Sequence, residues 1–423
     1  MLRRLCLAAA AAVLLAAPAA AQEESARRLA VFDHVWSAIG DLYYDPGLNG
    51  VDWQAVRARY RPRAAAAPDD RALHGVLAAM TGELRDSHTR VLTPEQVRDR
   101  RNEQTTTSGA ILFEVEGRPA VYAVRPGSPA AEAGLKPGME VLAVNGVAVG
   151  EALARARAEV GPSSSGRAAL VLSYLRLIAG PLGEPLRLEL ETAEGERRSV
   201  ALMRRPLDAA PRFEVRRLGS GALHVRFDRF RKPVARRLRE ALLAHPDATA
   251  LILDLRSNTG GDGREGARAV APLLDAPTLI ARLSTRTGRP PSALLGLVRL
   301  PLTLSAGRRG GQLFAGPVLI LIDEGTASTS EVIAASLQER GRARIVGTRS
   351  CGCALGVLRR RPLATGGALA ISEVGLVSGL GRRIEGEGVS PDVPVALTLD
   401  DLRAGRDPAL AAAEREAARI AGR

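Results

Sequence analysis

The C-terminal half of the chain alternates between short apolar runs and longer runs with helical spacing. Strands without a polar face must be covered on both sides, and the helices that follow them can provide that cover. The pattern predicts an α/β layer with a mostly buried sheet, followed by an amphipathic helix over Pro408 to Ile420. From about Phe213 onward the runs are ALHVRF, VARRLREALLAH, TALILDLR, GREGARAVAPLL, VLILID, SEVIAASLQERG and ARIVG.

Two other regions precede this layer, because a chain of 423 residues is too long for one hydrophobic core. From Ala26 to about Gln96, apolar residues recur every three to four positions and predict a small helical unit. From about Gly109 to Arg205, short strands bounded by turns predict a β-rich domain. Within the α/β layer, the stretch from Thr285 to Gly316 is rich in Gly, Pro and Arg and predicts a long loop or lid.

The N-terminus has the pattern of a secretory signal. Arg3 and Arg4 precede an apolar stretch, and small residues follow it before Gln22, where the mature chain is expected to start. No later segment is apolar for the ~20 residues that a membrane span needs. We therefore expect a protein that is exported to the periplasm or secreted.

The charge and the cysteine content limit the classes of ligand that we expect this chain to bind. The formal net charge is +13, but the basic residues are scattered and aromatic residues make up only 3% of the chain. Nucleic-acid-binding domains gather basic residues on one face or element, so no nucleic-acid partner is expected. Cys351 and Cys353 are one residue apart, which predicts free thiols or a labile bridge. No further ligands cluster near them, so they are expected to pack as small residues rather than hold a metal.

A tight turn, GTAS, places Ser328 between the apolar run VLILID and a helix. A serine at such a corner has an exposed hydroxyl, and the amide of Thr329 lies at the positive end of the helix. Gly260 and Gly261 follow another buried strand and let the backbone approach a substrate closely. These features predict Ser328 as a nucleophile and an oxyanion hole built from Thr329, Gly260 and Gly261.

Three ordered motifs, LDLRSNTGG, GTASTSE and EGEGVSPDVPV, resemble those of the C-terminal-processing and tricorn-type serine peptidases. The run SPAAEAGLKPGMEVLAVNG is similar to the core of a PDZ domain. The resemblance implies endopeptidase activity on peptide or protein substrates without a metal or organic cofactor. It also implies a multidomain α/β fold: a signal peptide at 1–21, an N-terminal helical domain at 22–104, a PDZ-like β-rich domain at 105–205 and a crotonase-like (ClpP/crotonase) catalytic core at 206–423.

The expected basic partner of Ser328 is absent. One branch of the resembled family places a lysine 25 residues after its serine, and that position here is Cys353. A neutral thiol is a poor base for activating a hydroxyl. The two lysines of the chain, Lys136 and Lys232, lie in a PDZ-like turn and at a helix start. The lysine arrangement is therefore excluded.

The tricorn branch instead uses a histidine oriented by another serine and a glutamate, and the matching positions are His88, Ser87 and Glu385. The ordinary pKa of histidine, ~6.5, lets it take and return a proton near neutral pH. A hydroxyl or carboxylate behind the ring would fix its tautomer. The structural alternatives are a histidine without a catalytic role, as in the lysine branch, and a Glu385 that only belongs to a polar turn.

Other polar residues are expected to be structural. Asp254, Arg256 and Asn258 are predicted to hold the glycine loop rather than react. The four histidines without motif support are His34, His74, His224 and His245.

The PDZ-like domain has a candidate peptide site of its own. Residues Gly109, Ala110, Ile111 and Leu112 fall where such domains place the loop that captures a terminal carboxylate. The alternative is a module that only positions other domains.

The sequence as a whole predicts an exported serine endopeptidase that forms an acyl-enzyme at Ser328, with His88 as the base. One alternative is an inactive peptide-binding scaffold that kept the fold. The other is an arrangement in which Cys353 assists Ser328.

Overall fold

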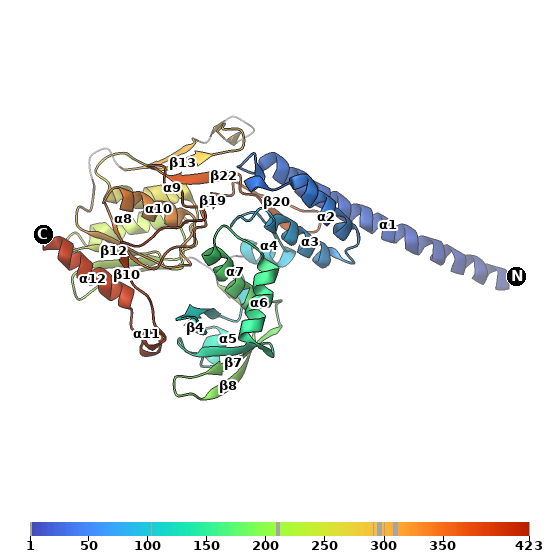
Figure 1. Cartoon of the computed structure of the whole chain (residues 1–423), viewed down its shortest axis with the longest axis horizontal. Helices are drawn as coiled ribbons and strands as arrows, with labels where there is room; N and C mark the ends of the chain where they lie inside the picture. Colours follow the sequence, from blue (N-terminus) through green and yellow to red (C-terminus); the bar gives the residue numbers. More distant parts are fainter. Residues whose placement is uncertain are drawn as a thin grey trace.

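The computed structural model describes residues 2–102, 104–208, 212–290, 292–293, 298–299, 301–307 and 312–422, and of residues 2–21, 292–293 and 298–299 it describes the backbone alone. Figure 1 shows three parts: helices at the N-terminal end, a small β-rich domain, and a large α/β core that carries the C-terminus. This multidomain α/β architecture confirms the predicted fold class. Within the described part of the chain, no helix combines the length and hydropathy that a membrane crossing needs.

The N-terminal part consists of helices α1 (Leu2–Leu42), α2 (Trp53–Ala65), α3 (Asp70–Gly82) and α4 (Pro94–Arg101) and the 3₁₀ turn η1 (Leu48–Gly50). Phe32, Val35 and Ile39 are fully buried at the three-to-four-residue spacing of one helix face. They pack with side chains of α2 and α3 and with three residues of the distant α/β core: Leu363, Leu369 and Ile371. The signal peptide predicted for residues 1–21 falls on the start of α1, outside the described side chains, and stays a prediction.

The PDZ-like domain is a sheet with the strand order β3-β4-β5-β7-β8, in which the short β6 also pairs with β5. Leu186, Leu188 and Leu190 alternate inward along β7 and are at most 1% exposed, as a half-buried strand requires. The strands are β3 (Ala110–Val115), β4 (Arg118–Val124), β5 (Glu140–Val144), β6 (Val147–Ala148), β7 (Pro185–Glu191) and β8 (Arg197–Met203). The helices are α5 (Pro129–Glu132), α6 (Val149–Val160) and α7 (Gly166–Ile178).

Strands β2 (Gln104–Thr107) and β9 (Arg205–Asp208) pair antiparallel at the two ends of the PDZ-like domain. This ribbon brings together the chain segments that enter and leave the domain. The domain is therefore an insertion between the N-terminal helices and the core, with its entry and exit side by side.

The core contains a six-stranded sheet with the order β10-β11-β12-β17-β18-β23. Strand β10 is antiparallel to β11, and the other pairs are parallel. The predicted buried sheet is confirmed, because every residue of β12 and β17 is buried. The strands are β10 (Phe213–Arg217), β11 (Leu223–Phe227), β12 (Leu251–Asp254), β17 (Val318–Ile322), β18 (Arg344–Gly347) and β23 (Val393–Pro394).

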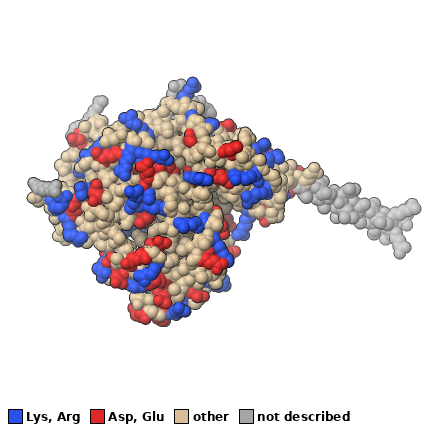
Figure 2. Space-filling view, in the orientation of Figure 1, with Lys and Arg blue, Asp and Glu red and all other residues tan. Residues whose placement is uncertain are grey.

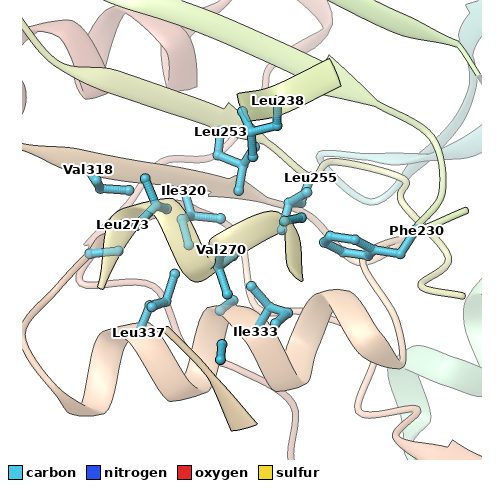
Figure 3. Packing of buried hydrophobic residues seen from close by; sticks show 14 of the residues in the cluster. Phe230, Leu238, Leu253, Leu255, Val270, Leu273, Val318, Ile320, Ile333 and Leu337 are labelled. Carbon is cyan, nitrogen blue, oxygen red and sulfur yellow. The ribbon is translucent and has the colours of Figure 1, made fainter. Parts of the chain in front are cut away.

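Helices cover both faces of this sheet. Leu253 and Ile320 point into a cluster with side chains of α8 (Val234–Ala244), α9 (Gly263–Val270) and α10 (Thr329–Glu339), which Figure 3 shows. Ile252 and Leu319 belong to a second cluster, with alanines of α12 (Pro408–Ala421). The predicted C-terminal helix is thus confirmed and closes a three-layer core. Short helices η2 (Ala271–Leu273) and α11 (Leu399–Ala404) complete the set.

Two small sheets flank the large one. One has the order β1-β21-β20 and joins the N-terminal part to the core; the other has the order β16-β13-β22-β19. Their strands are β1 (Arg90–Leu92), β20 (Arg360–Pro362), β21 (Ala368–Ala370), β13 (Thr278–Ser284), β16 (Thr303–Ala306), β19 (Leu355–Gly356) and β22 (Val374–Ser378).

The loop or lid predicted from Thr285 to Gly316 is wrong in part. Strand β16 lies within it and pairs with β13, and a further hairpin is formed by β14 (Ser292–Ala293) and β15 (Val298–Arg299). Residues 291, 294–297, 300 and 308–311 of this stretch lie outside the described residues.

Candidate active site

Ser328 sits at the corner between β17 and α10, directly before the first residue of the helix. Its backbone has φ 58°, a left-handed conformation that costs a non-glycine residue about 1–3 kcal/mol unless the surroundings hold it. Two hydrogen bonds hold it here: the Ser328 amide lies 2.8 Å from the Cys353 carbonyl and 3.0 Å from Glu331 Oε2. The predicted strand-to-helix corner is therefore present, and Ser328 is partly exposed on it.

Glu331 organises this corner and was missed by the sequence reasoning. Its carboxylate is fully buried and accepts hydrogen bonds from the Ser350 hydroxyl at 2.6 Å and from the amides of Gly352 and Cys353 at 2.7 and 2.9 Å, besides that of Ser328. Burial raises the pKa of Glu331 above its ordinary value, although these hydrogen bonds oppose the rise. The available signal was the spacing Ser-x-x-Glu, typical of a helix N-terminus.

The glycine loop packs directly against Ser328. A Cβ added to Gly260 would lie 2.7 Å from the Ser328 Cβ, so only glycine fits there. The Thr329 hydroxyl donates to the Gly261 carbonyl at 2.9 Å and joins the loop to α10. The Gly260 amide donates to Asn258 Oδ1 at 3.0 Å. Of the three amides predicted for the oxyanion hole, that of Gly260 is thus occupied, and those of Gly261 and Thr329 have no acceptor among the described residues and are available to an oxyanion.

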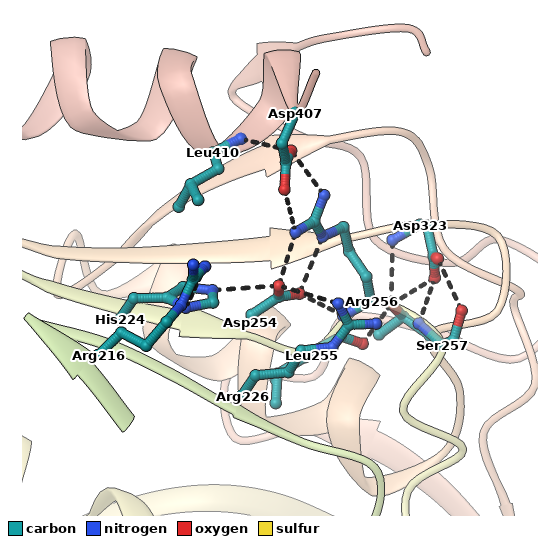
Figure 4. A network of polar contacts seen from close by, with 11 residues as sticks. Arg216, His224, Arg226, Asp254, Leu255, Arg256, Ser257, Asp323, Asp407 and Leu410 are labelled. Atoms are coloured by element: carbon teal, nitrogen blue, oxygen red, sulfur yellow. Dashed lines mark hydrogen bonds and ion pairs between the residues drawn. The ribbon is translucent and has the colours of Figure 1, made fainter. Parts of the chain in front are cut away.

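Asn258 supports the glycine loop as expected. Asn258 Nδ2 donates to the Phe227 carbonyl at 2.7 Å, and Asn258 Oδ1 also accepts from the Ser330 hydroxyl at 2.9 Å. Asp254 is fully buried at the end of β12 and pairs with Arg256 at 2.6 Å, within the network drawn in Figure 4. The prediction that these residues hold the glycine loop is thus confirmed for Asn258, whereas Asp254 and Arg256 join β12 to His224 of β11 and to Asp407 at the start of α12.

His88 lies on the loop between α3 and β1, in the N-terminal part. Asp86 fixes this loop, because its Oδ1 accepts from the amides of His88 and Thr89, both at 2.6 Å. The Ser87 hydroxyl lies 2.6 Å from His88 Nδ1 and 3.2 Å from Glu385 Oε1. Glu385 Oε2 accepts from the Ala354 amide at 2.5 Å. The structure thus brings Ser87, His88 and Glu385 together in one chain of contacts.

His88 and Glu385, at the two ends of this series of contacts, have shifted pKa values. Burial lowers the pKa of His88 below its ordinary value, with Asp86 opposing the shift and Arg90 adding to it. Burial raises the pKa of Glu385 to about 7, and the nearby charge of Asp86 contributes to the rise. His88 is therefore neutral at neutral pH, as a general base must be, while Glu385 changes its charge near pH 7.

His88 and Ser328 line the same cavity, which has a volume of about 670 Å³. Gly261 and Thr329 line it as well, so the nucleophile, the candidate base and the two available donors face one space. Neither Lys136 nor Lys232 lines this cavity, and both are exposed elsewhere on the protein.

Cys351 and Cys353 form a disulfide, so of the two expected states, free thiols or a labile bridge, the structure has the bridge. A sulfur in a disulfide carries no proton and cannot assist Ser328 as a thiolate, which removes the serine–cysteine arrangement in this state. Both cysteines are buried against Ala168 of α7. The Ser165 hydroxyl donates to the Cys351 carbonyl at 2.7 Å, so the PDZ-like domain braces the loop that holds Ser328.

The four histidines expected to be structural occupy different surroundings. His74 is buried and lies 2.8 Å from the Thr365 hydroxyl, and His224 is buried 3.2 Å from Asp254. His34 is exposed on α1, and His245 ends α8. None of them lines the cavity of Ser328.

The candidate peptide loop of the PDZ-like domain leads into β3, an edge strand of its sheet. Gly109 has φ 83° and lies against Ser128, while Ala110 and Leu112 are buried and Ile111 is exposed. The Gly109 amide donates to the Thr107 hydroxyl at 3.1 Å. The edge of β3 is the position at which PDZ domains add a peptide strand.

Comparison with known proteins gives three matches along the chain. Residues 222–395 match peptidase family S41, residues 25–82 match the tricorn protease C1 domain, and residues 120–159 match a PDZ domain. A carboxyl-terminal-processing protease of Synechocystis sp. is 27% identical over 86% of this chain and 80% of its own length. A putative tricorn protease homolog 2 of Streptomyces coelicolor is 30% identical over 90% of this chain but 31% of its own length.

Two solved structures share the fold. The photosystem II D1 C-terminal processing protease superimposes with a TM-score of 0.59 at 23% identity, over 92% of this chain and 96% of that one. Mature CPAF in complex with lactacystin gives a TM-score of 0.68 at 16% identity, over 94% and 99%. At these identities the likeness concerns the fold.

Proposed function

Because this chain belongs to peptidase family S41, we propose that it is an exported serine endopeptidase with Ser328 as its nucleophile and His88 as its general base. The observation that carries the proposal is the contact chain from Glu385 through Ser87 to His88, which ends in the cavity that Ser328 lines. Its substrates are extended segments of peptides or proteins.

The contact chain sets the tautomer of His88. When Glu385 is ionised it only accepts, so the Ser87 hydroxyl donates to Glu385 and accepts the proton of His88 Nδ1. The other ring nitrogen, Nε2, is then left without a proton. That is the form of histidine able to take a proton from a serine hydroxyl.

Hydrolysis then follows in two halves. As Ser328 Oγ attacks the substrate carbonyl, its proton passes to His88, and the amides of Gly261 and Thr329 stabilise the oxyanion. His88 returns the proton to the leaving amine, which departs and leaves an acyl-enzyme. A water molecule, deprotonated by His88, attacks the acyl group, and the proton returned to Ser328 restores the free enzyme.

The test is labelling of the full chain with a fluorophosphonate probe. We expect Ser328 to be labelled, Ser328→Ala to remove the labelling, and His88→Ala to slow it by about 10²- to 10⁴-fold. His34→Ala is the matched control, because His34 is exposed on α1 and should leave the rate unchanged.

Three outcomes separate the alternatives. Absence of labelling at every pH from about 6 to 9 would favour the inactive scaffold. Undiminished labelling of His88→Ala would reject His88 as the base. Loss of labelling in Cys353→Ala but not in His88→Ala would restore the serine–cysteine arrangement.

Export is a separate part of the proposal. It is supported by the signal pattern before Gln22 and by the disulfide, because disulfides persist in oxidising compartments. The intact mass of the chain recovered from the periplasm or medium should correspond to a start at Gln22. A chain that keeps Met1 and stays in the cytosol would contradict export.

A further inference from the structure

The wall of the cavity beside Ser328 is strongly basic. Five arginines from separate segments of the protein line it, and much of the remaining wall is apolar. The arginines are Arg90, Arg100, Arg229, Arg264 and Arg360, and the apolar residues include Leu283, Leu302, Leu304, Leu355, Leu358 and Leu376. The space in which a substrate would lie therefore presents cations and hydrocarbon together.

The backbone register places two of these arginines in one row. Arg90 of β1 and Arg360 of β20 are the partners of Ala370 on either side of β21. Residues in one such row share a face of the sheet, and Ala370 itself lines the cavity. The fold thus sets two like charges on the same face, two strands apart.

A third arginine lies against the glycine loop. A Cβ added to Gly261 would lie 3.2 Å from Cγ of Arg229, and the Phe230 amide donates to the Gly260 carbonyl at 2.8 Å. Arg229 is therefore held next to one of the two amides available to an oxyanion. A substrate bound for attack by Ser328 passes close to it.

None of the five guanidinium groups has a carboxylate within ion-pair distance in the described structure. Asp262, the acidic residue of the cavity wall, instead accepts from the amides of Arg264 and Glu265 as the cap of α9. Asp86 influences Arg90 only through its charge. All five arginine residues line the cavity and keep exposed surface, even where part of the side chain is buried, so a ligand can reach them.

Some arginines elsewhere in the described chain pair with acidic side chains, and others, such as Arg63 and Arg239, have no ion pair. Arg57 and Arg61 share Asp33, and Arg256 lies between Asp254 and Asp407. Figure 2 shows basic and acidic side chains intermingled over the visible face. The five arginines of the cavity differ from other unpaired arginines because they converge on one space beside Ser328.

The group is electrostatically unfavourable when the cavity is empty. Burial lowers the pKa of Arg100 to about 10, and repulsion from Arg360, Arg90 and Arg229 adds to the shift. The arginines remain charged at neutral pH, so the repulsion persists. Carboxylates that enter the cavity would relieve it, because guanidinium groups bind carboxylates in bidentate fashion.

We propose that this cavity selects peptide segments that carry acidic side chains beside apolar ones near the bond to be cleaved. The proposal rests on the proposed peptidase function and names its substrate class. A terminal carboxylate supplies the same chemistry, but one carboxylate cannot pair with five guanidinium groups. The structure therefore favours a segment with several acidic side chains.

Binding to the full-length Ser328→Ala variant tests the preference without requiring turnover. Fluorescence anisotropy would compare labelled decapeptides that share one apolar sequence and contain Glu and Asp, or Gln and Asn, or Lys. Each would carry a free or an amidated C-terminus. We expect the peptides with Glu and Asp to bind ~10-fold or more tightly than those with Gln and Asn. The preference should weaken between about 50 and 500 mM salt and persist when the C-terminus is amidated.

Variants of the arginine row locate the effect. The double change Arg90→Gln and Arg360→Gln should abolish most of the preference, and Arg90→Lys with Arg360→Lys should restore part of it. Arg236→Gln is the control, because Arg236 is 70% exposed on α8 and does not line the cavity. Thermal unfolding of each variant checks that the fold is kept.

Equal binding of acidic and neutral peptides would overturn the proposal, as would a complete lack of peptide binding. A preference that vanishes with the amidated terminus would assign the arginines to a terminal carboxylate instead. A preference that survives the Arg→Gln pair would place it outside the cavity. Failure of the peptidase function is seen separately, as absence of probe labelling in the wild type.

Discussion

Two buried carboxylates of the core, Asp254 and Glu385, have pKa values that move in opposite directions. Although burial acts to raise it, hydrogen bonds from Arg256 and His224 hold the pKa of Asp254 well below its ordinary value. Burial and the charge of Asp86 raise the pKa of Glu385 to about 7, and its hydrogen bonds to Ala354 and Ser87 only partly oppose this. The difference lies in the partners: a cation for Asp254, neutral donors for Glu385.

The comparison separates a structural acid from an acid suited to catalysis. Asp254 lies in the closed network of Figure 4, where Arg256 joins it to Asp407 at the start of α12. No cation of the described residues pairs with Glu385, so its pKa lies where a small change of environment alters its protonation. In this chain a carboxylate matched by arginine holds the scaffold, and an unmatched one lies at the candidate site.

Removal of the cation should have the largest effect on stability. Arg256→Ala leaves Asp254 buried without its main partner, so we expect the free energy of unfolding to fall by about 3–5 kcal/mol. Denaturant titration measures it, with Arg57→Ala as the control, because the pair of Arg57 with Asp33 is partly exposed and contributes at most ~1 kcal/mol. If both variants lost the same free energy of unfolding, the buried pair of Arg256 would matter no more than the partly exposed pair of Arg57.

The pH dependence of this network follows from the sign of the shift. The pKa of Asp254 is lower in the folded state, so its ionisation stabilises the protein above its ordinary value of ~3.9. This contribution should be lost as the pH falls below about 4 in the wild type.

Neutralising Glu385 should affect activity rather than the fold. Glu385→Gln keeps an acceptor for Ser87 but cannot ionise, so we expect kcat/KM above pH 7 to fall by on the order of 10²-fold. In the wild type kcat/KM should rise as the pH increases through about 7, where Glu385 ionises. The variant should lack this rise.

Stability gives an independent readout for the same variant. The pKa of Glu385 is raised in the folded state, so its ionisation destabilises the wild type as the pH rises from about 4 through 7. The variant should therefore gain stability relative to the wild type above pH 7. An unchanged rise of kcat/KM in the variant would show that another group controls it.

The smallest effect should come from the outer partner of the Arg256 network. Asp407 accepts from the Leu410 amide at 3.0 Å as the cap of α12, and it also pairs with Arg256. Asp407→Ala should lower the free energy of unfolding by about 1–2 kcal/mol, and Asp407→Asn by less, because asparagine still caps the helix. If Asp407→Ala lost as much free energy of unfolding as Arg256→Ala, Asp407 would contribute as much to stability as the buried Asp254 pair.

The fold was predictable where the pattern of apolar residues along the sequence is strong. The fully apolar runs of β12 and β17 specify a sheet covered on both faces. Helices α6 and α7 were missed, because their residues follow a series of strand-like runs and the helical spacing is weak between turns. Strand β16 was missed within a stretch rich in turn-forming residues, since its pairing with β13 is a tertiary contact.

The candidate site was predictable residue by residue but not in its electrostatics. Ser328 and the glycine loop carry local signals of turn and helix start. Glu331 was missed because its four partners come from two segments. The five arginines of the cavity could not be found from the sequence, because tertiary contacts gather them: the pairing of β1, β21 and β20 places Arg90 and Arg360 in one row, and the other three come from separate segments.

The site is divided along the chain, and this has a consequence for biosynthesis. His88 belongs to the part that is translated first, and Ser328 follows 240 residues later (328 − 88), after the whole PDZ-like domain. On the proposed mechanism a nascent chain that ends before Ser328 holds only one member of the proton-transfer pair, and a half-folded chain has not brought the two together. Hydrolysis therefore begins only when β1 docks on β21, so the peptidase stays latent until its own folding is finished.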